Sequence, residues 1–332
     1  MEKFNIYSKE TIADLISERS GEIKFGQRIQ FVSALEELKS SSAKFVIFGV
    51  PEDIGIRANY GKPGAVTAWN AFLPAFLNIQ KNRYNFPGNC ILLGELDCDE
   101  WMKQASEIFP YDTNYHENLG KLVSEIDEVL SEIVGHIISE KKVPIIIGGG
   151  HNNAFGNIKG TSEVLKKPIN VLNIDAHTDL RSTEYRHSGN GFSKAIQENF
   201  LKKYAVFGLH ENYTPETIFR QMESNENIEF QLFEDLLNLT CEEKKNELKK
   251  EIDFLEKEFG LEIDCDCMAN FPSSALTPSG FSLNELRAFV RMLNQFNPHY
   301  LHLCEASAEN EAWVGKALAY LVSDFMQETI FD

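Results

Sequence analysis

The stretch "VLNIDAHTDLR", residues 171–181, joins a short apolar run to three polar side chains at alternate positions. The apolar run has the composition and length of a buried strand. Asp175, His177 and Asp179 follow at the point where such a strand ends. Because ligands bind beyond the carboxyl ends of the strands in an open parallel sheet, the stretch predicts a buried parallel strand with a binding site at its end.

Seven further apolar runs predict the rest of the sheet. They cover residues 43–50, 90–96, 143–149, 203–209, 228–233, 260–266 and 299–305. Segments of helical period lie between or after the runs, namely 119–137, 241–258, 282–295 and 311–326. In the first of these segments, apolar side chains recur every three or four residues, as on one buried helix face. Strands that alternate with helices are typical of a doubly wound α/β domain with a parallel sheet.

The predicted strands begin near residue 43, and no Pro, Gly and Ser-rich linker divides the chain after that point. We therefore expect a single domain over residues 41–332. Residues 1–40 are less regular, and we expect them to form a peripheral segment that packs on the outside of this domain.

The chain of 332 residues carries 50 acidic and 32 basic side chains, which gives a formal net charge of −18. This charge disfavours nucleic acid and anionic membrane surfaces as partners, because both repel an acidic protein. The first 30 residues have no secretory signal. No apolar run approaches the roughly 18 residues that span a bilayer. The interpretation is a cytoplasmic protein without a membrane segment.

Polar side chains also follow three of the other predicted strands. A glycine triplet and His151 follow the first, Asp264 and Asp266 follow the second, and Glu305 ends the third. Since the carboxyl ends of parallel strands share one rim of the sheet, we expect these side chains to converge. The candidate metal ligands are His151, Asp175, His177, Asp179, Asp264 and Asp266.

Two histidines and four aspartates include too many carboxylates for a structural zinc site. Mixed imidazole and carboxylate ligands fit Mn²⁺ better, and six ligands are enough for two ions per chain. Fe²⁺, Co²⁺ and Zn²⁺ remain open as alternatives. A water molecule held between two such ions becomes a hydroxide nucleophile near neutral pH. Alone, the DxHxD motif also fits a solvated turn, and the DxD motif also fits a capping or hinge feature. The two together with a glycine-led histidine favour a metal site.

These residues resemble the arginase-like ureohydrolases, which include arginase, agmatinase and formimidoylglutamase. The motifs are "GGGH" (148–151), "DAHTD" (175–179), "DCD" (264–266) and Glu305, and the resemblance spans roughly residues 43–330. It implies a three-layer α/β/α fold with a mostly parallel sheet and a dinuclear manganese site. It also implies that one ion lies among His151, Asp175, Asp179 and Asp264, with His177 and Asp266 around the other.

Within this family, the chain is more similar to formimidoylglutamases than to arginases. Arginases place a histidine four positions after the serine of the loop that follows DxHxD, and "SGNGF" (188–192) has Phe192 there, as formimidoylglutamases do. The "DLR" of 179–181 and the loop "EDIGIRANYGKPGA" (52–65) are also similar to the formimidoylglutamase form.

Two features depart from the formimidoylglutamase pattern. Asn152 and Asn153 follow His151, where a glutamate is usual, and Glu262 stands where serine or threonine is usual. These departures leave the metal ligands intact and leave the substrate open.

The resemblance and the residue types together give three candidate catalytic side chains. Asp179 would accept a hydrogen bond from the nucleophile, and Glu305 would pair with an amidinium nitrogen of the substrate. Glu305 could instead cap a helix. His187 would donate a proton to the leaving nitrogen, although a histidine facing solvent fits the sequence equally well.

Three further side chains are candidates for substrate binding. Arg181 offers the planar fork that binds a carboxylate through two hydrogen bonds. The alternative role of Arg181 is a surface or interchain ion pair. Ser188 and Asn190 lie in the loop that follows the metal motif and are predicted to contact the substrate.

The favoured function is hydrolysis of a small-molecule amidine, N-formimino-L-glutamate, to L-glutamate and formamide, as in histidine degradation. The alternatives are an arginase, agmatinase or other guanidino-acid hydrolase that releases urea, and a metal-binding pseudoenzyme. Relatives in the family assemble as trimers and hexamers, so a homo-oligomer is compatible with the resemblance.

Overall fold

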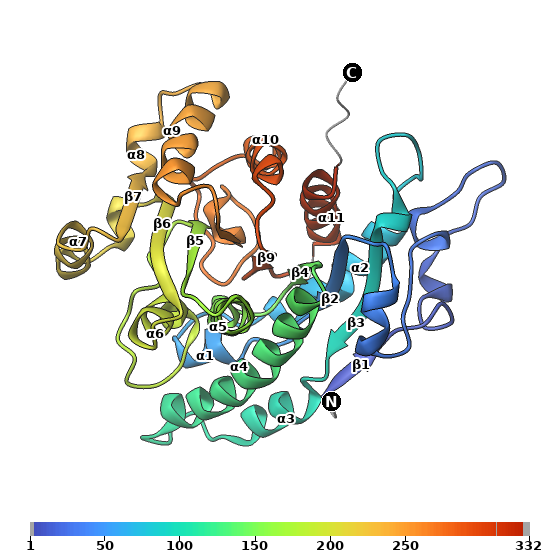
Figure 1. The fold of residues 1–332 in the computed structure, drawn as a ribbon. Helices are drawn as coiled ribbons and strands as arrows, with labels where there is room; N and C mark the ends of the chain where they lie inside the picture. Colours follow the sequence, from blue (N-terminus) through green and yellow to red (C-terminus); the bar gives the residue numbers. More distant parts are fainter. Residues whose placement is uncertain (1–2, 310, 328–332) are drawn as a thin grey trace.

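The computed structural model describes residues 3–309 and 311–327, and its centre is a nine-stranded sheet (Figure 1). In sheet order the strands are β1 (Phe4–Ile6), β3 (Cys90–Leu96), β2 (Phe45–Gly49), β4 (Val143–Ile147), β9 (Leu301–Cys304), β8 (Gly260–Asp264), β5 (Ile169–Ile174), β6 (Leu201–Leu209) and β7 (Ile228–Leu232). All neighbours pair in parallel except β1 and β3. The eight predicted strands are confirmed within two residues of their ends.

Helices cover both faces of this sheet. They are α1 (Ile54–Ala58), α2 (Ala68–Leu77), α3 (Asp99–Glu107), α4 (Tyr115–Ser139), α5 (Ala154–Leu165), α6 (Gly191–Gln197), α7 (Glu216–Glu223), α8 (Phe233–Leu236), α9 (Cys241–Phe254), α10 (Leu283–Leu293) and α11 (Trp313–Phe325). Figure 1 shows α2, α9, α10 and α11 on one side of the sheet and α1, α4, α5 and α6 on the other. This is the predicted three-layer α/β/α fold. None of the described helices is long and apolar enough to cross a membrane.

Two apolar clusters explain why the strands are apolar along their whole length. In β2, Phe45 and Ile47 pack into one cluster, whereas Val46 and Phe48 pack into the other. Successive side chains of a strand point to opposite faces, so a strand covered by helices on both sides buries all of them.

The N-terminal segment contributes a strand that the sequence analysis did not predict. Strand β1 pairs antiparallel with β3 at the edge of the sheet, with Phe4 opposite Leu96. The segment also buries Ile12 and Phe25 in the cluster that contains α2. The described part of this segment, residues 3–40, therefore adds a strand to the sheet edge and side chains to the core. The division of the chain at residue 41 stays a prediction.

The strand order brings the candidate site together. The four strands that end in candidate residues, β4, β9, β8 and β5, are consecutive neighbours in the middle of the sheet. After β4 the chain passes over the positions of β9 and β8 before it enters the sheet again as β5. Such a change of direction leaves a crevice at the carboxyl ends of the strands.

Candidate metal centre

The structure brings all six predicted metal ligands together in two groups that share one residue. Within each group, one ligand atom per residue lies within 4.8 Å of all the others. The larger group is His151, Asp175, Asp179 and Asp264. The smaller group is Asp175, His177 and Asp266. A shared carboxylate between two groups is the geometry that a pair of neighbouring cations requires.

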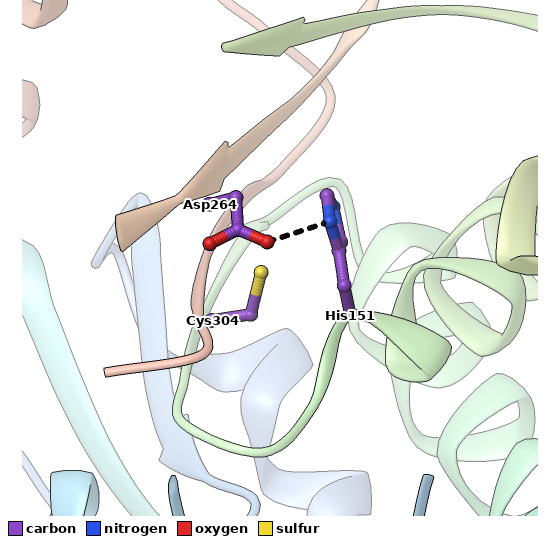
Figure 2. Close-up of side chains that lie close together, drawn as sticks. All are labelled: His151, Asp264 and Cys304. Atoms are coloured by element: carbon purple, nitrogen blue, oxygen red, sulfur yellow. Dashed lines mark ion pairs between the residues drawn. The ribbon is translucent and has the colours of Figure 1, made fainter. Parts of the chain in front are cut away.

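His151 is the centre of the larger group. Its Nδ1 atom lies 2.9 Å from Asp179 Oδ2 and 3.2 Å from an oxygen of each of Asp175 and Asp264. Figure 2 shows His151 and Asp264 facing each other. Neither ring nitrogen of His151 makes a hydrogen bond with a described residue, although the ring is fully buried. A buried imidazole without a hydrogen bond, among carboxylate oxygens, fits a metal ligand.

Local turns fix the direction of the acidic side chains. The backbone N–H of His177 donates to Asp175 Oδ1 at 2.7 Å, and that of Asp266 donates to Asp264 Oδ1 at 2.8 Å. In both motifs, the first carboxylate therefore bonds to the backbone two residues later, as in an Asx turn. Asp179 has a positive φ of 47°, which is rare for a residue other than glycine and concentrates at functional sites.

The glycines before His151 allow close contact between two loops. Gly148 and Gly149 have φ values of 92° and 75°. A Cβ atom on Gly149 would lie 2.1 Å from Asn153 Nδ2 and 3.1 Å from Glu52 Oε1. These glycines therefore let the backbone after β4 approach Glu52 and Asn153 closely.

The sequence analysis missed Glu52, which holds the loop that carries His151. Its Oε1 atom accepts hydrogen bonds from Gly150 N at 3.0 Å, Asn152 Nδ2 at 3.2 Å and Asn153 Nδ2 at 2.8 Å. Its Oε2 atom accepts from Ile54 N at 2.6 Å. Burial raises the pKa of Glu52, and these donors oppose the rise. The two asparagines that depart from the family pattern thus bind a buried carboxylate.

Glu262, the other departure, lies behind His151. Its Oε2 atom lies 2.5 Å from His302 Nδ1 and 3.7 Å from His151 Nε2. Burial opposes its charged form, but His302 lowers the pKa of Glu262 to about 2. At 3.7 Å the Glu262 carboxylate lies beyond hydrogen-bond reach of His151 Nε2. Its close partner is therefore His302.

The acidic side chains repel one another in the absence of a cation. Burial, reinforced by the charge of Asp266, raises the pKa of Asp264 well above its usual range. Burial also raises the pKa of Asp266 to about 6. Buried charges are costly unless they are paired or coordinate a metal. Divalent cations would balance this excess of negative charge, so the residues fit a pair of metal ions.

A cavity of about 470 Å³ opens over these residues. Its lining includes the candidate site residues His177, Asp179, Arg181, Ser188, Asp264, Asp266 and Glu305. Residues that the sequence analysis did not select also line it, among them Asn59, Tyr213, Thr217 and Ser274. The Tyr213 ring stacks on His177 with ring centroids 5.1 Å apart. The cavity joins a carboxylate-rich surface to one arginine and several hydroxyl groups.

The Arginase family model matches residues 43–329. The chain belongs to the arginase family.

Two curated relatives from this family are formimidoylglutamases. The Macrococcus caseolyticus protein is 28% identical over 211 residues, which cover 63% of this chain and 60% of the relative. The Streptococcus pyogenes serotype M3 protein is 25% identical over 233 residues, which cover 68% of this chain and 64% of the relative. The aligned regions therefore span less than two thirds of the length of either relative.

Solved structures of the family share the fold. Trypanosoma cruzi formiminoglutamase with Mn²⁺ gives a TM-score of 0.73 at 17% identity, over 92% of this chain and 98% of that chain. Formimidoylglutamase from Bacillus subtilis gives a TM-score of 0.74 at 16% identity, over 93% of each chain. These likenesses confirm the predicted arginase-like fold.

Arg181 and Ser188 lie in the cavity wall of this arginase-family chain. Arg181 is exposed, and its guanidinium makes no ion pair with any residue of the described ranges. Its backbone N–H donates to Gly189 O at 3.0 Å. Ser188 Oγ accepts a hydrogen bond from Asn59 Nδ2 at 3.1 Å. The wall therefore combines a free cation with hydrogen-bonding groups.

Asn190 and His187 are not brought into the cavity lining. Asn190 is fully buried, and its Nδ2 atom donates to the carbonyl oxygens of Ser182 and Tyr185, both at 2.8 Å. His187 Nδ1 accepts from Gly189 N at 3.1 Å. Burial lowers the pKa of His187 to about 4. Both side chains bond within their own loop and hold its shape.

Glu305 lines the cavity at the end of β9. Its Oε1 atom accepts from His151 N at 2.7 Å, and its Oε2 atom accepts from Ser274 Oγ. Burial, followed by the nearby charge of Asp264, raises the pKa of Glu305 well above its usual range. The carboxylate thus caps the helical turn that begins at His151 and also faces the site.

A buried ion pair that the sequence analysis missed anchors the wall of the cavity. Arg186 Nε donates to Asp127 Oδ2 at 2.8 Å, and its NH2 group donates to Asn152 O at 2.9 Å. Asp127 lies on the buried face of α4. An acidic residue within an otherwise apolar stripe was the sequence signal for this contact.

Proposed function

We propose that this protein is a dinuclear manganese hydrolase that converts N-formimino-L-glutamate and water to L-glutamate and formamide, a reaction of histidine degradation. The observation that carries the proposal is the Arg181 guanidinium, which has no ion pair among the described residues and lies in the same cavity as a carboxylate-rich surface. A formimino group is cationic and fits the acidic surface, whereas the glutamate part carries carboxylates that fit an arginine. The two formimidoylglutamase relatives support this assignment.

In this proposal the larger ligand group would hold one Mn²⁺, and His177 with Asp266 would hold the other. Asp175 belongs to both groups, so its carboxylate would serve both ions. Mixed imidazole and carboxylate ligands suit Mn²⁺, and Mn²⁺ accompanies the Trypanosoma cruzi structure. The bound ions would activate the attacking water and neutralise the negative charge that develops during its attack.

The residues of the chain position the remaining atoms of the reaction. Asp179 accepts a hydrogen bond from the water, which adds to the amidine carbon. The Glu305 carboxylate holds a nitrogen of the amidinium group and so orients this carbon toward the water. The bond between that carbon and the glutamate nitrogen then breaks, and this nitrogen takes a proton to leave as an amine.

Arg181 sets the substrate class in this proposal. Two parallel hydrogen bonds from its guanidinium to a carboxylate would hold the far end of the substrate. Ser188 and Asn59 would add hydrogen bonds on the same wall, while Asn190 keeps the loop in place. The acidic surface alone also fits a guanidinium group. The alternative function is therefore hydrolysis of a guanidino compound with release of urea.

A panel of substrates assayed with Mn²⁺ tests the proposal. Formiminoglutamate should be turned over with release of formamide, and arginine, agmatine and guanidino acids should be turned over far more slowly. Urea release without turnover of formiminoglutamate would establish the alternative.

Arg181→Lys tests the substrate contact within the same assay. Lysine keeps the charge but loses the planar fork, and a hydrogen bond to a charged group contributes about 1.5 to 3 kcal/mol. We expect kcat/KM for formiminoglutamate to fall roughly 10-fold to 100-fold, and to fall further in Arg181→Ala, with no change in metal content. Arg28→Ala, at another exposed arginine, is the control. A kcat/KM near the wild-type value in Arg181→Ala would remove the residue from the substrate site.

A further inference from the structure

A thiol lies directly beside the larger ligand group. Cys304 is the last residue of β9, and its Sγ atom forms a group with one ligand atom each of His151 and Asp264, all within 4.8 Å of one another. Figure 2 shows the thiol pointing into the space between the Asp264 carboxylate and the His151 ring. The proposed function gives this thiol no task.

The surroundings of Cys304 differ from those of the other cysteines. All six cysteines are free. Those packed into or against the two apolar clusters are Cys90, Cys98, Cys241, Cys265 and Cys267. Cys304 is fully buried but belongs to neither cluster. Its Sγ atom lies near ligand atoms of His151 and Asp264 and donates to Ile263 O at 3.6 Å, so the thiol faces polar atoms.

His151 provides an independent sign that a ligand belongs here. The side chain is fully buried, and neither of its ring nitrogens makes a hydrogen bond with a described residue. An imidazole nitrogen, a carboxylate oxygen and a thiol sulfur thus face a common space. Mn²⁺ prefers the oxygen and nitrogen atoms of this set, whereas a thiolate selects softer ions such as Zn²⁺ and Cd²⁺.

We infer that Cys304, His151 and Asp264 form a binding site for a thiophilic divalent cation, which competes with the Mn²⁺ ion of the proposed function. Only the competition depends on the proposed function, because the three donor side chains are present in the chain itself. Binding breaks the S–H bond of Cys304 and forms a bond between sulfur and the cation. The proton goes to solvent, and neither the sulfur nor the metal changes its oxidation state.

Titration of the Mn²⁺-loaded full chain with Cd²⁺ tests the inference. The absorption band of a cadmium thiolate in the ultraviolet reports the sulfur ligand, and the electron paramagnetic resonance signal of free Mn²⁺ reports displacement. We expect the band to rise as Mn²⁺ is released. In Cys304→Ala and Cys304→Ser, the band should vanish, and the Cd²⁺ concentration that displaces half of the Mn²⁺ should rise at least about tenfold.

Cys267→Ala is the matched control, because Cys267 is also buried and follows the ligand Asp266 but packs in an apolar cluster. This variant should keep both the band and the displacement. A band that persists in both Cys304 variants, or that is absent from the wild type, would overturn the inference. Circular dichroism checks that the variants fold.

X-ray absorption at the cadmium edge measures the Cd–S distance in the wild-type protein, so this test does not depend on the folding of either Cys304 variant. The absence of sulfur scattering would overturn the inference. Turnover of formiminoglutamate by the same Mn²⁺-loaded preparation separates the two hypotheses. Turnover without a cadmium thiolate band overturns the soft-metal site alone. A band without turnover overturns the proposed function alone.

Discussion

The buried Glu52 carboxylate holds the loop that carries His151 through hydrogen bonds, and in all of these hydrogen bonds it is the acceptor. Substitution of Glu52 therefore tests how this loop is held. We expect Glu52→Gln to lower the free energy of unfolding and to weaken Mn²⁺ binding, although residue 52 is not a candidate ligand. The substitution keeps the volume of the side chain and replaces one acceptor oxygen by an NH2 group, which can only donate.

The size of the effect follows from the positions of the donors. Three donors, from Gly150, Asn152 and Asn153, meet Oε1, whereas the N–H groups of Ile54 and Gly55 meet Oε2 at 2.6 and 3.4 Å. In the better orientation of the new amide, its oxygen faces the three donors and its NH2 group faces these two N–H groups. This loses the short charge-assisted bond from Ile54 and the longer one from Gly55 and leaves buried N–H groups unsatisfied, which together cost roughly 3 kcal/mol. Glu52→Ala removes both acceptors and should cost more than about 4 kcal/mol.

Two measurements separate the expected effects. Urea unfolding of the metal-free protein gives the change in stability, and equilibrium dialysis against Mn²⁺ gives the change in binding. Glu37→Gln is the matched control, since Glu37 also accepts hydrogen bonds, from the backbone and hydroxyl of Ser33, but is exposed. It should alter neither quantity. A free energy of unfolding for Glu52→Gln within about 0.5 kcal/mol of the wild type, the range of ordinary surface substitutions, would refute this account of the loop.

Two other predictions concern the metal ligands and the pH dependence of stability. His177→Ala and Asp264→Ala should abolish turnover and lower the Mn²⁺ content below two ions per chain. The circular dichroism spectra of both variants should stay close to that of the wild type. Substantial activity in either variant at saturating Mn²⁺ would reject the ligand assignment. Burial, reinforced by Glu229 and Glu247, raises the pKa of Glu251 from 4.5 to about 8. Because the folded-state pKa is the higher one, this stability term is fully present below about pH 4.5 and is lost as the pH rises to about 8. Glu251→Gln should therefore stabilise the protein by roughly 4 kcal/mol at pH 8 and by little at pH 4.5. Urea unfolding at both pH values measures this difference, and equal effects at the two values would contradict the assignment.

The parts of the fold and site that the sequence predicts depend on local patterns. The strand that ends at Ile174 is a short apolar run, and the ligands after it stand at fixed spacing, so both can be read within a dozen residues. Strand β1 was not predicted, because three residues at a sheet edge are too few to show an alternating pattern. The motif position of Asn190 predicted a substrate contact, but its side chain turns into its own loop.

Contacts between segments that are distant in the sequence could not be predicted from local sequence patterns. Glu52 meets its partners Gly150, Asn152 and Asn153 across about 100 residues of chain. No periodicity marks such a contact, because it arises only when the loops after β2 and β4 come together at adjacent strand ends. The asparagines were visible as an unusual pair, but their partner was not.

The buried pair of Arg186 and Asp127 also has a consequence for motion. Arg186 belongs to the same loop as Arg181 and Ser188, and it binds both α4 and the carbonyl of Asn152. Swinging this loop outward would leave a buried carboxylate without its partner, at a cost of about 3 to 5 kcal/mol. At that cost an open loop is populated well below one molecule in a hundred, so this wall of the cavity moves with α4 as one rigid body and does not act as a lid.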